Sequence, residues 1–434
     1  MSDHDLCLLV SGRWDNTVSV VDVRAALTPE NEATPNAILN TVRVTPDLAA
    51  GAGGAGPLVA SGQPVTMVVA PAAGRVFLVN HSGSARPEAA AAFQHGHPGA
   101  IAVLDLALLF DRRTAGTLAA VRAFIETGTA GPVGCALAPD ARHLLVTSAE
   151  AAGREDGGRQ ITVIDVDSSS VLHQVSLAAR GRAEREPSPQ PAPHPTFGHY
   201  PCPNGIAVSP LAGGLAFTAN GGTGDVSVIR LAAALRNEPG AEVVAPVPVE
   251  TGPFGIAVSP DGGLVAVASR ENARTGTHGR TVSLIEVERA AAGSAGAEVA
   301  RVPVGIGPDG RPSRPFDVTF TPDGRHVLAT CNRTGVVSCV DVAQALAGKP
   351  SETFRLELTV PSGGEPSPRG IAVAPGGRLA AVVGGRKGGP RSSLVWVIDL
   401  AERRVAATVA GVGNEAYALA FAIRPDALPA SPPR

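Results

Sequence analysis

The sequence contains few aromatic residues, few charged residues and no excess of basic residues. Phe, Trp and Tyr make up 3% of its 434 residues and charged residues 17%, and the formal net charge is −3. A duplex nucleic acid or an anionic membrane surface attracts proteins that carry a basic field, and this chain has none. We therefore expect neither nucleic acid nor a membrane among its partners.

Membrane-spanning segments and disulfide patterns are also missing from the sequence. No apolar run approaches the ~20 residues of a spanning helix, and no basic segment precedes the first apolar strand as in a secretory signal. These absences predict a cytoplasmic protein. The cysteines are odd in number and form no Cys-x-x-Cys pair, which favours small buried thiols over a disulfide framework. They are Cys7, Cys135, Cys202, Cys331 and Cys339.

Several catalytic and cofactor motifs are absent as well. The sequence has no Gly-rich loop followed by Lys-Ser/Thr, no Gly-x-Ser-x-Gly elbow and no EF-hand loop. The glycine clusters at Gly221–Gly224 and Gly384–Gly389 are typical of hairpin loops. We expect no nucleotide cofactor.

A repeated unit is what the sequence does contain. In Gly252–Gly262 a short apolar run is followed by Ser-Pro-Asp-Gly, whose residues favour a tight turn, and a second apolar run follows at Leu264–Ala268. This pattern predicts a β-hairpin. Related units begin near Val65, Val133, Asn204, Phe316, Arg369 and Tyr417.

Each unit except the last continues with a third alternating run and then a fourth strand. The third runs end in a polar or charged residue, usually acidic, as in Ile161–Asp165 and Val395–Asp399. Four short strands in each of seven units predict an all-β, seven-bladed propeller with four antiparallel strands per blade. We expect one domain over residues 1–426, with insertions at 81–99 and 179–203 and a disordered tail at 427–434.

The two ends of the chain each supply part of one blade. The N-terminus begins with three strand-like runs and lacks a first strand, whereas Tyr417–Ile423 is a first strand without a blade. Pairing the two closes the ring and removes two sheet edges that would otherwise invite aggregation. We therefore predict that the C-terminal strand completes the N-terminal blade.

The stretch Leu9–Asp22, together with Gly252–Gly262, resembles the YVTN-type β-propeller repeat of the lactonase-like propeller group. The resemblance extends from Leu6 to Asp426 and implies the propeller fold. By analogy it implies lactone chemistry, that is hydrolysis, ring opening or ring closing. It supplies no catalytic residues, because no lactonase-type His/Glu/Arg motif can be matched to these positions.

Histidines gather in the loops predicted for one face of the ring. Those loops join strand two to strand three, and strand four to the next blade. Neutral imidazole binds Zn, Cu or Fe, and a thiolate favours Zn or Cu, so we predict one divalent transition metal there. The alternative is that these are solvated loop residues. The candidate ligands are His81, His95, His97, His194, His199 and Cys202.

A second group of candidates surrounds the predicted channel mouth. The first residues of the inner strands include apolar and aromatic side chains and one arginine, Arg369, which could grip an anion or instead pair with Asp317 or Glu415. Further basic residues in the same loops favour an anionic ligand. The candidate binding residues are Arg369, Asn204, Phe254, Phe316, Asp317, Arg13, Trp14, Arg270, Arg333 and Arg386.

The sequence as a whole favours an enzyme that acts on a small anionic metabolite at the channel mouth, in a metal-assisted hydrolase, lyase or cyclase reaction. The alternative is a non-catalytic propeller that binds a ligand or a protein partner at the same place. Side chains able to transfer protons there are His81, His97, His199, Tyr417 and Glu271.

Overall fold

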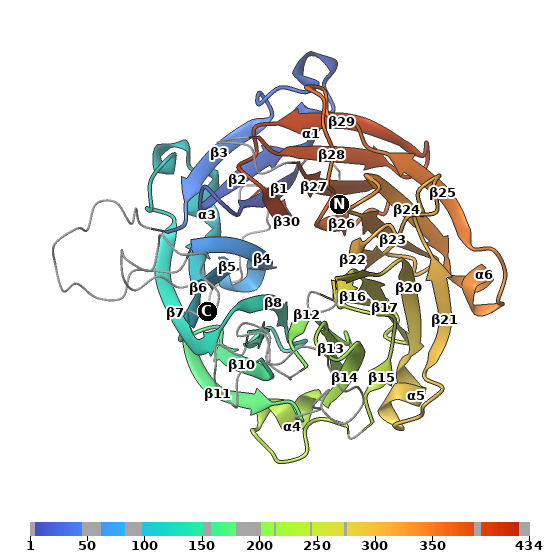
Figure 1. Ribbon diagram of the computed structural model, residues 1–434. Coiled ribbons are helices and arrows are strands. Elements are labelled where there is room, and N and C mark those ends of the chain that lie inside the picture. The colour runs from blue at the N-terminus through green and yellow to red at the C-terminus, as the bar shows by residue number, and fades with distance from the viewer. Residues whose placement is uncertain are drawn as a thin grey trace.

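Seven small sheets stand around a common axis in the computed structural model (Figure 1). The structure describes residues 5–45, 62–82, 98–150, 158–178, 201–211, 214–243, 245–272, 276–385 and 392–424. Each sheet has four antiparallel strands, and the first strand of each lies closest to the axis. The predicted seven-bladed all-β propeller is confirmed.

We number the blades from the one that closes the ring. Blade one contains β30 (Ala416–Ile423), β1 (Leu6–Gly12), β2 (Thr17–Asp22) and β3 (Ile38–Arg43). Blade two contains β4 (Gly62–Ala70), β5 (Arg75–Ser82), β6 (Pro98–Asp105) and β7 (Val121–Ala130). Blade three contains β8 (Pro132–Leu137), β9 (His143–Ser148), β10 (Gln160–Asp165) and β11 (Ser170–Ser176).

The other four blades follow in chain order. Blade four contains β12 (Pro203–Val208), β13 (Leu215–Asn220), β14 (Asp225–Arg230) and β15 (Val247–Pro248). Blade five contains β16 (Pro253–Val258), β17 (Leu264–Ser269), β20 (Thr281–Glu286) and β21 (Glu298–Pro303), with the small hairpin β18 (Glu271–Asn272) and β19 (Thr277–His278). Blade six contains β22 (Pro315–Phe320), β23 (His326–Cys331), β24 (Val336–Asp341) and β25 (Glu352–Glu357). Blade seven contains β26 (Ile371–Val373), β27 (Leu379–Gly384), β28 (Leu394–Asp399) and β29 (Arg404–Ala410).

Short helices follow the third strand of five blades, and they explain the acidic residue that ends most of those strands. Asp22, Asp105 and Asp341 each accept a hydrogen bond from a backbone N–H in the first helical turn, which is the role of an N-cap. No helix in the described ranges is long and apolar enough to cross a membrane. The helices are α1 (Val23–Ala26), η2 (Pro29–Asn31), η4 (Pro71–Ala73), α3 (Leu106–Phe110), η5 (Arg112–Thr114), α4 (Leu231–Leu235), α5 (Val287–Ala291) and α6 (Val342–Leu346).

A β-bulge recurs at the same position near the start of the inner strand in blades one to six. In blade five, Pro253 pairs with Ser269 and Ile256 with Val267, so Phe254 and Gly255 together face one residue of β17. The bulges of the other five blades lie at the matching position. A bulge turns a side chain away from the regular alternation of a strand. Here it directs one residue of each inner strand toward the channel.

Hydroxyl groups on second strands join neighbouring blades near the axis. Thr147 Oγ1 donates to the Asn204 carbonyl at 2.5 Å, and Thr330 Oγ1 donates to the Arg369 carbonyl at 2.5 Å. Ser11 donates to the Val65 carbonyl at 3.1 Å. These bonds satisfy backbone groups that a buried inner strand cannot pair on its channel side.

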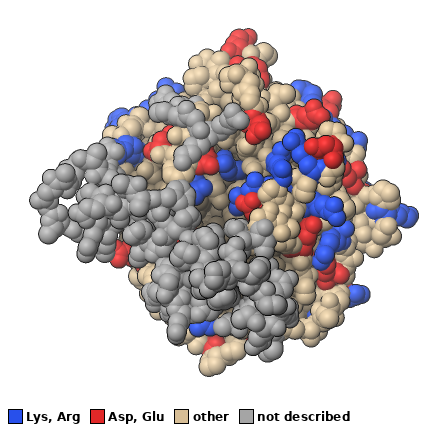
Figure 2. All heavy atoms as spheres, viewed as in Figure 1, with Lys and Arg blue, Asp and Glu red and all other residues tan. Residues whose placement is uncertain are grey.

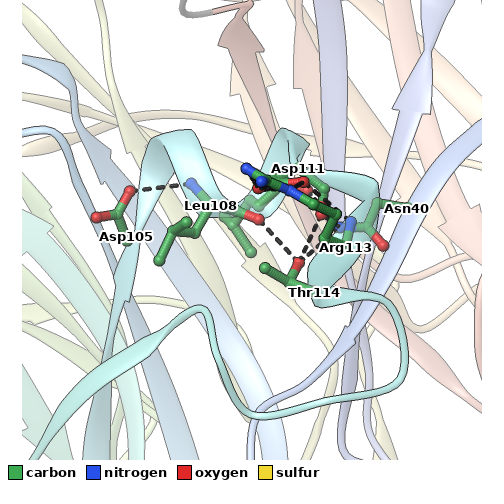
Figure 3. A network of polar contacts seen from close by, with 7 residues as sticks. Asn40, Asp105, Leu108, Asp111, Arg113 and Thr114 are labelled. Atoms are coloured by element: carbon green, nitrogen blue, oxygen red, sulfur yellow. Dashed lines mark hydrogen bonds and ion pairs between the residues drawn. The ribbon is translucent and has the colours of Figure 1, made fainter.

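Blade one is closed by both ends of the chain, as predicted. Strand β30 pairs with β1 from Leu6↔Ile423 to Gly12↔Ala416, and Arg424 forms an ion pair with Asp22 at 2.6 Å. Figure 3 shows a second connection, between blades one and two. Asn40 of β3 donates from Nδ2 to the Leu109 and Asp111 carbonyls and to Thr114 Oγ1, at 2.9 to 3.0 Å. This buried amide fixes blade one to the α3–η5 connection of blade two.

Candidate functional site

A cavity of about 290 Å³ lies at the channel mouth. Its floor is formed by residues at the inner-strand bulges, and its walls by the loops that the sequence places on the mouth face. This volume is at the small end for ligand pockets. It suits a small metabolite.

Three aromatic rings and three guanidinium groups form one half of this pocket. The ring centroids of Phe254, Phe316 and Tyr417 lie 4.7 to 6.5 Å apart. The Arg270 guanidinium lies 5.0 and 4.8 Å from the Phe254 and Phe316 centroids. Arg13 and Arg369 lie 5.2 and 5.9 Å from the Tyr417 centroid. An apolar floor below fixed positive charge suits a ligand with a flat or ring-shaped body and negative charge.

In all seven blades, the residue two positions before the channel-facing residue of the inner strand, such as Phe254 or Arg369, has a left-handed backbone. Five of the seven are not glycine, although this conformation costs a side-chain-bearing residue about 1 kcal/mol or more. Several of them place their side chains at the mouth. The seven are Gln63, Gly131, Cys202, Gly252, Arg314, Ser367 and Glu415, with φ between 42° and 62°.

Glu415 uses this position to hold Arg369. Arg369 Nη2 donates to Glu415 Oε1 at 2.6 Å, and the two side chains are only 13% and 11% exposed. Burial lowers the pKa of Arg369, while Glu415 opposes that shift, so the guanidinium stays charged. Glu415 Oε2 is buried without a hydrogen-bond partner. The sequence offered Asp317 or Glu415 as the partner of Arg369, and the structure selects Glu415.

An imidazole–carboxylate pair lines the opposite wall of the pocket. His81 Nδ1 lies 3.1 Å from the Pro132 carbonyl oxygen, and Nε2 lies 3.2 Å from Glu150 Oε1. The carbonyl oxygen can only accept, so Nδ1 carries a proton. The hydrogen bond between His81 Nε2 and Glu150 Oε1 needs a second proton, which either of these two atoms can carry. Glu150 is 2% exposed, and it fills the space beside Gly131, where a Cβ would come within 2.3 Å of Glu150 Cγ.

A second charged group, which we call the Glu271 cluster, borders the pocket at blades five and six. It consists of Arg270, Glu271, His278, Arg314 and Arg333. Arg270 and Glu271 also line the cavity. Figure 2 shows basic and acidic side chains close together beside the central opening on this face.

Asp317 lies below the aromatic floor, in a separate cavity of about 110 Å³ along the channel. Its carboxyl oxygens accept from the Val318 N–H at 2.9 Å and the Ile371 N–H at 3.3 Å. Most other inner strands have a small residue at this position. At Gly255, for example, a Cβ would lie 2.7 Å from Asp317 Oδ1. Burial raises the pKa of Asp317 from 3.8 to about 6.

This shifted pKa predicts an unusual dependence of stability on pH. A carboxyl group that binds its proton more tightly in the folded state stabilises the fold at low pH. Its contribution decreases as the pH rises from about 4 to about 6, by about 3 kcal/mol in total. We expect the difference in free energy of unfolding between the wild type and Asp317→Asn to fall by that amount over this range, measured by denaturant titration.

Asp323→Asn is the matched control for Asp317→Asn. Asp323 belongs to the same blade, and hydrogen bonds from Thr321 and the Arg325 N–H lower the pKa of its carboxyl group. Its contribution to stability should therefore increase with pH, with the opposite sign. A wild-type minus Asp317→Asn difference that is flat between pH 4 and 7 would contradict the assignment.

The structure brings together many of the predicted site residues. His81, Cys202, Asn204, Phe254, Arg270, Glu271, Phe316, Arg369, Arg13 and Tyr417 all line the mouth cavity. Trp14 stacks with Arg13 at 5.3 Å, Arg333 belongs to the Glu271 cluster, and Asp317 lies below the floor. His95, His97, His194, His199 and Arg386 lie outside the described residues.

Most ligands of the predicted metal site are the four histidines that lie outside the described residues. Among the residues that the structure describes, no three His, Cys, Asp or Glu side chains converge as a metal site. His81 and Cys202 share the cavity, but both nitrogens of His81 already make hydrogen bonds. Ligation of a metal by His81 would break one of those bonds.

Arg314 and Glu150 are mouth residues that are not among the candidates from the sequence, and Glu415 is named there only as a possible partner of Arg369. Arg314 and Glu415 occupy the same repeat position, two residues before Phe316 and Tyr417. Aligning the repeats at this position would have identified both. Glu150 follows a second strand, where its place in the pocket depends on the adjacent Gly131.

Comparison with known proteins indicates the fold of this chain but assigns the chain to no family. No family model matches the sequence, and no curated protein matches it. A periplasmic gluconolactonase of Pseudomonas aeruginosa is 18% identical with a TM-score of 0.63, covering 97% of this chain and 99% of that one. A candidate 6-phosphogluconolactonase of Bacteroides fragilis is 13% identical with a TM-score of 0.60, covering 97% and 98%. Hydrazine synthase of Kuenenia stuttgartiensis is 17% identical with a TM-score of 0.59, covering 92% and 94%. Identities this low indicate a common fold and leave the activity open.

Proposed function

We propose that this protein hydrolyses a small lactone with negative charge, in the mouth cavity. The observation that carries the proposal is the buried His81–Glu150 pair facing a cavity with an aromatic floor and three guanidinium groups. Two of the similar structures bear names of lactone hydrolases, which supports this reaction class.

Proton transfer falls to the His81–Glu150 pair. Water attacks the lactone carbonyl carbon and gives a proton to the pair, either at Glu150 or at His81 Nε2. The ring C–O bond then breaks, and the leaving alkoxide takes a proton back from the pair. The product is a hydroxy acid. The Pro132 carbonyl holds the imidazole in one orientation throughout, because it accepts from Nδ1.

The guanidinium groups of Arg13 and Arg369 hold the negative charge that develops on the carbonyl oxygen. Both lie beside Tyr417, and the pairing with Glu415 keeps Arg369 in place. Positive charge fixed in a partly buried site stabilises such an oxyanion without reorganisation. The rings of Phe254 and Phe316 would contact the less polar face of the lactone ring.

A metal remains a prediction that concerns this same cavity. Its ligands would come mainly from the histidines outside the described residues, with His81 or Cys202 adding one donor. The steps above use only side chains of the described residues, and metal analysis of the purified protein tests the metal separately.

Turnover of gluconolactone and its 6-phosphate, with simple aliphatic lactones for comparison, tests the proposal. We expect hydrolysis well above the spontaneous rate, followed by pH-stat titration. In the double variant Arg369→Gln/Glu415→Gln, which leaves no unpaired buried charge, kcat/KM should fall roughly tenfold or more, mainly through kcat, because the variant loses a group that stabilises the oxyanion.

The control is Arg378→Gln/Asp399→Asn, which removes another arginine–carboxylate ion pair, 3.1 Å long and with a more exposed arginine, from blade seven away from the mouth. Its kcat/KM should stay at the wild-type value. Tight binding of a hydroxy acid such as gluconate with no hydrolysis of any lactone would instead favour the alternative, a non-catalytic ligand-binding propeller.

A further inference from the structure

The Glu271 cluster contains more positively charged side chains than negatively charged ones. Glu271 Oε1 accepts from Arg270 Nη2 at 3.0 Å, and Oε2 accepts from Arg314 Nη2 at 2.5 Å. His278 Nε2 lies 3.8 Å from the same Oε2, and the Arg333 guanidinium donates to His278 Nδ1. The carboxylate of Glu271 thus pairs with two guanidinium groups, and the third, that of Arg333, contacts only the imidazole within this cluster.

His278 adds no charge to this balance. Its Nδ1 accepts a hydrogen bond from Arg333, which requires a neutral ring with the proton on Nε2. Burial lowers the pKa of His278, as do Arg314 and Arg333, while Glu271 opposes the shift. Three guanidinium groups, one carboxylate and a neutral imidazole leave two positive charges.

These charges are partly withdrawn from water. The side chains of Arg270, Glu271, His278 and Arg314 are between 20% and 28% exposed. Nε of both Arg270 and Arg314 is buried without a partner. Like charges held this close in a medium of reduced dielectric repel each other, so a bound anion would stabilise the arrangement.

The cluster is continuous with the mouth cavity. Arg270 covers the Phe254 and Phe316 rings of the cavity floor, and Glu271 is part of the wall. His81 and Glu150 belong to blades two and three, across the ring from blades five and six. A ligand whose reacting carbonyl faces His81–Glu150 can thus extend a second group toward the cluster.

We propose that the Glu271 cluster binds a doubly charged tetrahedral group of the ligand, namely a phosphate monoester. This inference rests on the proposed function for the remainder of the ligand. Two excess positive charges match a phosphate dianion, and guanidinium groups donate to phosphate oxygens in pairs. Arg314 and Arg333 are the binding residues outside the cavity itself, and Arg270 links the two sites.

Binding of inorganic sulfate tests whether the Glu271 cluster binds a tetrahedral dianion, and this measurement does not depend on catalysis. Sulfate is a tetrahedral dianion that does not titrate near neutral pH. Calorimetric titration at constant ionic strength should show binding to the wild type, weakened roughly tenfold or more in Arg314→Gln/Arg333→Gln. Arg280→Gln/Arg311→Gln removes the same charge from two more exposed arginines, which pair with Glu250 and Asp309. That control should bind sulfate as the wild type does.

Turnover supplies an independent readout. The ratio of kcat/KM for 6-phosphogluconolactone to that for gluconolactone should fall roughly tenfold or more in Arg314→Gln/Arg333→Gln and stay constant in the control. No sulfate binding to the wild type, or equal binding to both double variants, overturns the inference. Hydrolysis of both lactones at equal rates by the wild type also overturns it, together with the preference for a charged lactone, and lactone hydrolysis at His81–Glu150 then stands. If neither lactone is hydrolysed, the proposed function fails, and sulfate binding alone decides on the cluster.

Discussion

Replacing Glu150 with Gln should lower kcat for lactone hydrolysis by roughly 10²- to 10⁴-fold, the usual contribution of general acid–base catalysis. In the mechanism proposed above, Glu150 and His81 Nε2 exchange the proton, because Nδ1 is committed to the Pro132 carbonyl and Nε2 faces Glu150. A Gln side chain cannot accept the proton itself, and its amide N–H occupies the lone pair of His81 Nε2, so the transfer of a proton from water to the pair is strongly weakened. Steady-state kinetics separate the effect on kcat from the smaller effect expected on KM.

Asp140→Asn is the matched control for this substitution. His143 Nδ1 and Asp140 Oδ2 form another imidazole–carboxylate pair, 2.6 Å apart and more exposed, at the turn between the first two strands of blade three. Its loss should leave kcat at the wild-type level. If both substitutions lowered kcat equally, or if Glu150→Gln raised only KM, proton transfer by His81–Glu150 would be excluded.

The fold could be predicted because the repeat encodes it through local chemistry. The turn residues after the first strand, the alternating third strand and the acidic residue that caps the following helix all recur at a fixed spacing. The alignment of Phe254 with Tyr417, Phe316 and Arg369 then located the channel ring, since the bulge falls at the same place in most blades. Local rules of this kind need no knowledge of distant contacts.

Much of the site could not be predicted in the same way, because it depends on contacts between blades. Glu150 lines the cavity only because the residue beside it, Gly131, has no side chain. Arg314 is attached to the cluster through Glu271 of the preceding blade, 43 positions earlier in the numbering. The sequence also favoured Asp317 as a binding residue, and the structure places it below the aromatic floor, where tight packing of inner strands decides its surroundings.

The fold alone does not indicate the activity of this protein, because differently named proteins share it. A gluconolactonase and hydrazine synthase, proteins with quite different names, resemble this chain to nearly the same extent, with TM-scores of 0.63 and 0.59. The ring therefore sets only where loops meet, and the loop side chains decide the chemistry. In this protein those side chains are guanidinium groups, an imidazole and carboxylates.

Deleting the chain from Ala416 onward should prevent folding, because the whole mouth depends on blade one being complete. The deletion removes β30 and with it the buried side chains of Tyr417 and Leu419. Losing one large buried side chain costs about 2–5 kcal/mol, so losing several exceeds the 5–15 kcal/mol that stabilises a typical domain. We expect aggregation or the absence of a cooperative thermal transition, measured by circular dichroism and size-exclusion chromatography.

A variant that ends at Arg424 isolates the effect of this strand, since it retains β30 and the Arg424–Asp22 ion pair. Comparing the two variants tests whether the ring can close without strand β30. Asn40 still attaches blade one to blade two in both variants, and β1 to β3 still form a sheet. If the Ala416 deletion nevertheless melted at the temperature of the Arg424 variant as a monomer, three strands and one buried amide would suffice to close the ring. The C-terminal strand would then serve only to bring Tyr417 to the pocket. If it unfolds, pairing of the two chain ends is what holds the arginines, the aromatic floor and His81–Glu150 around one opening.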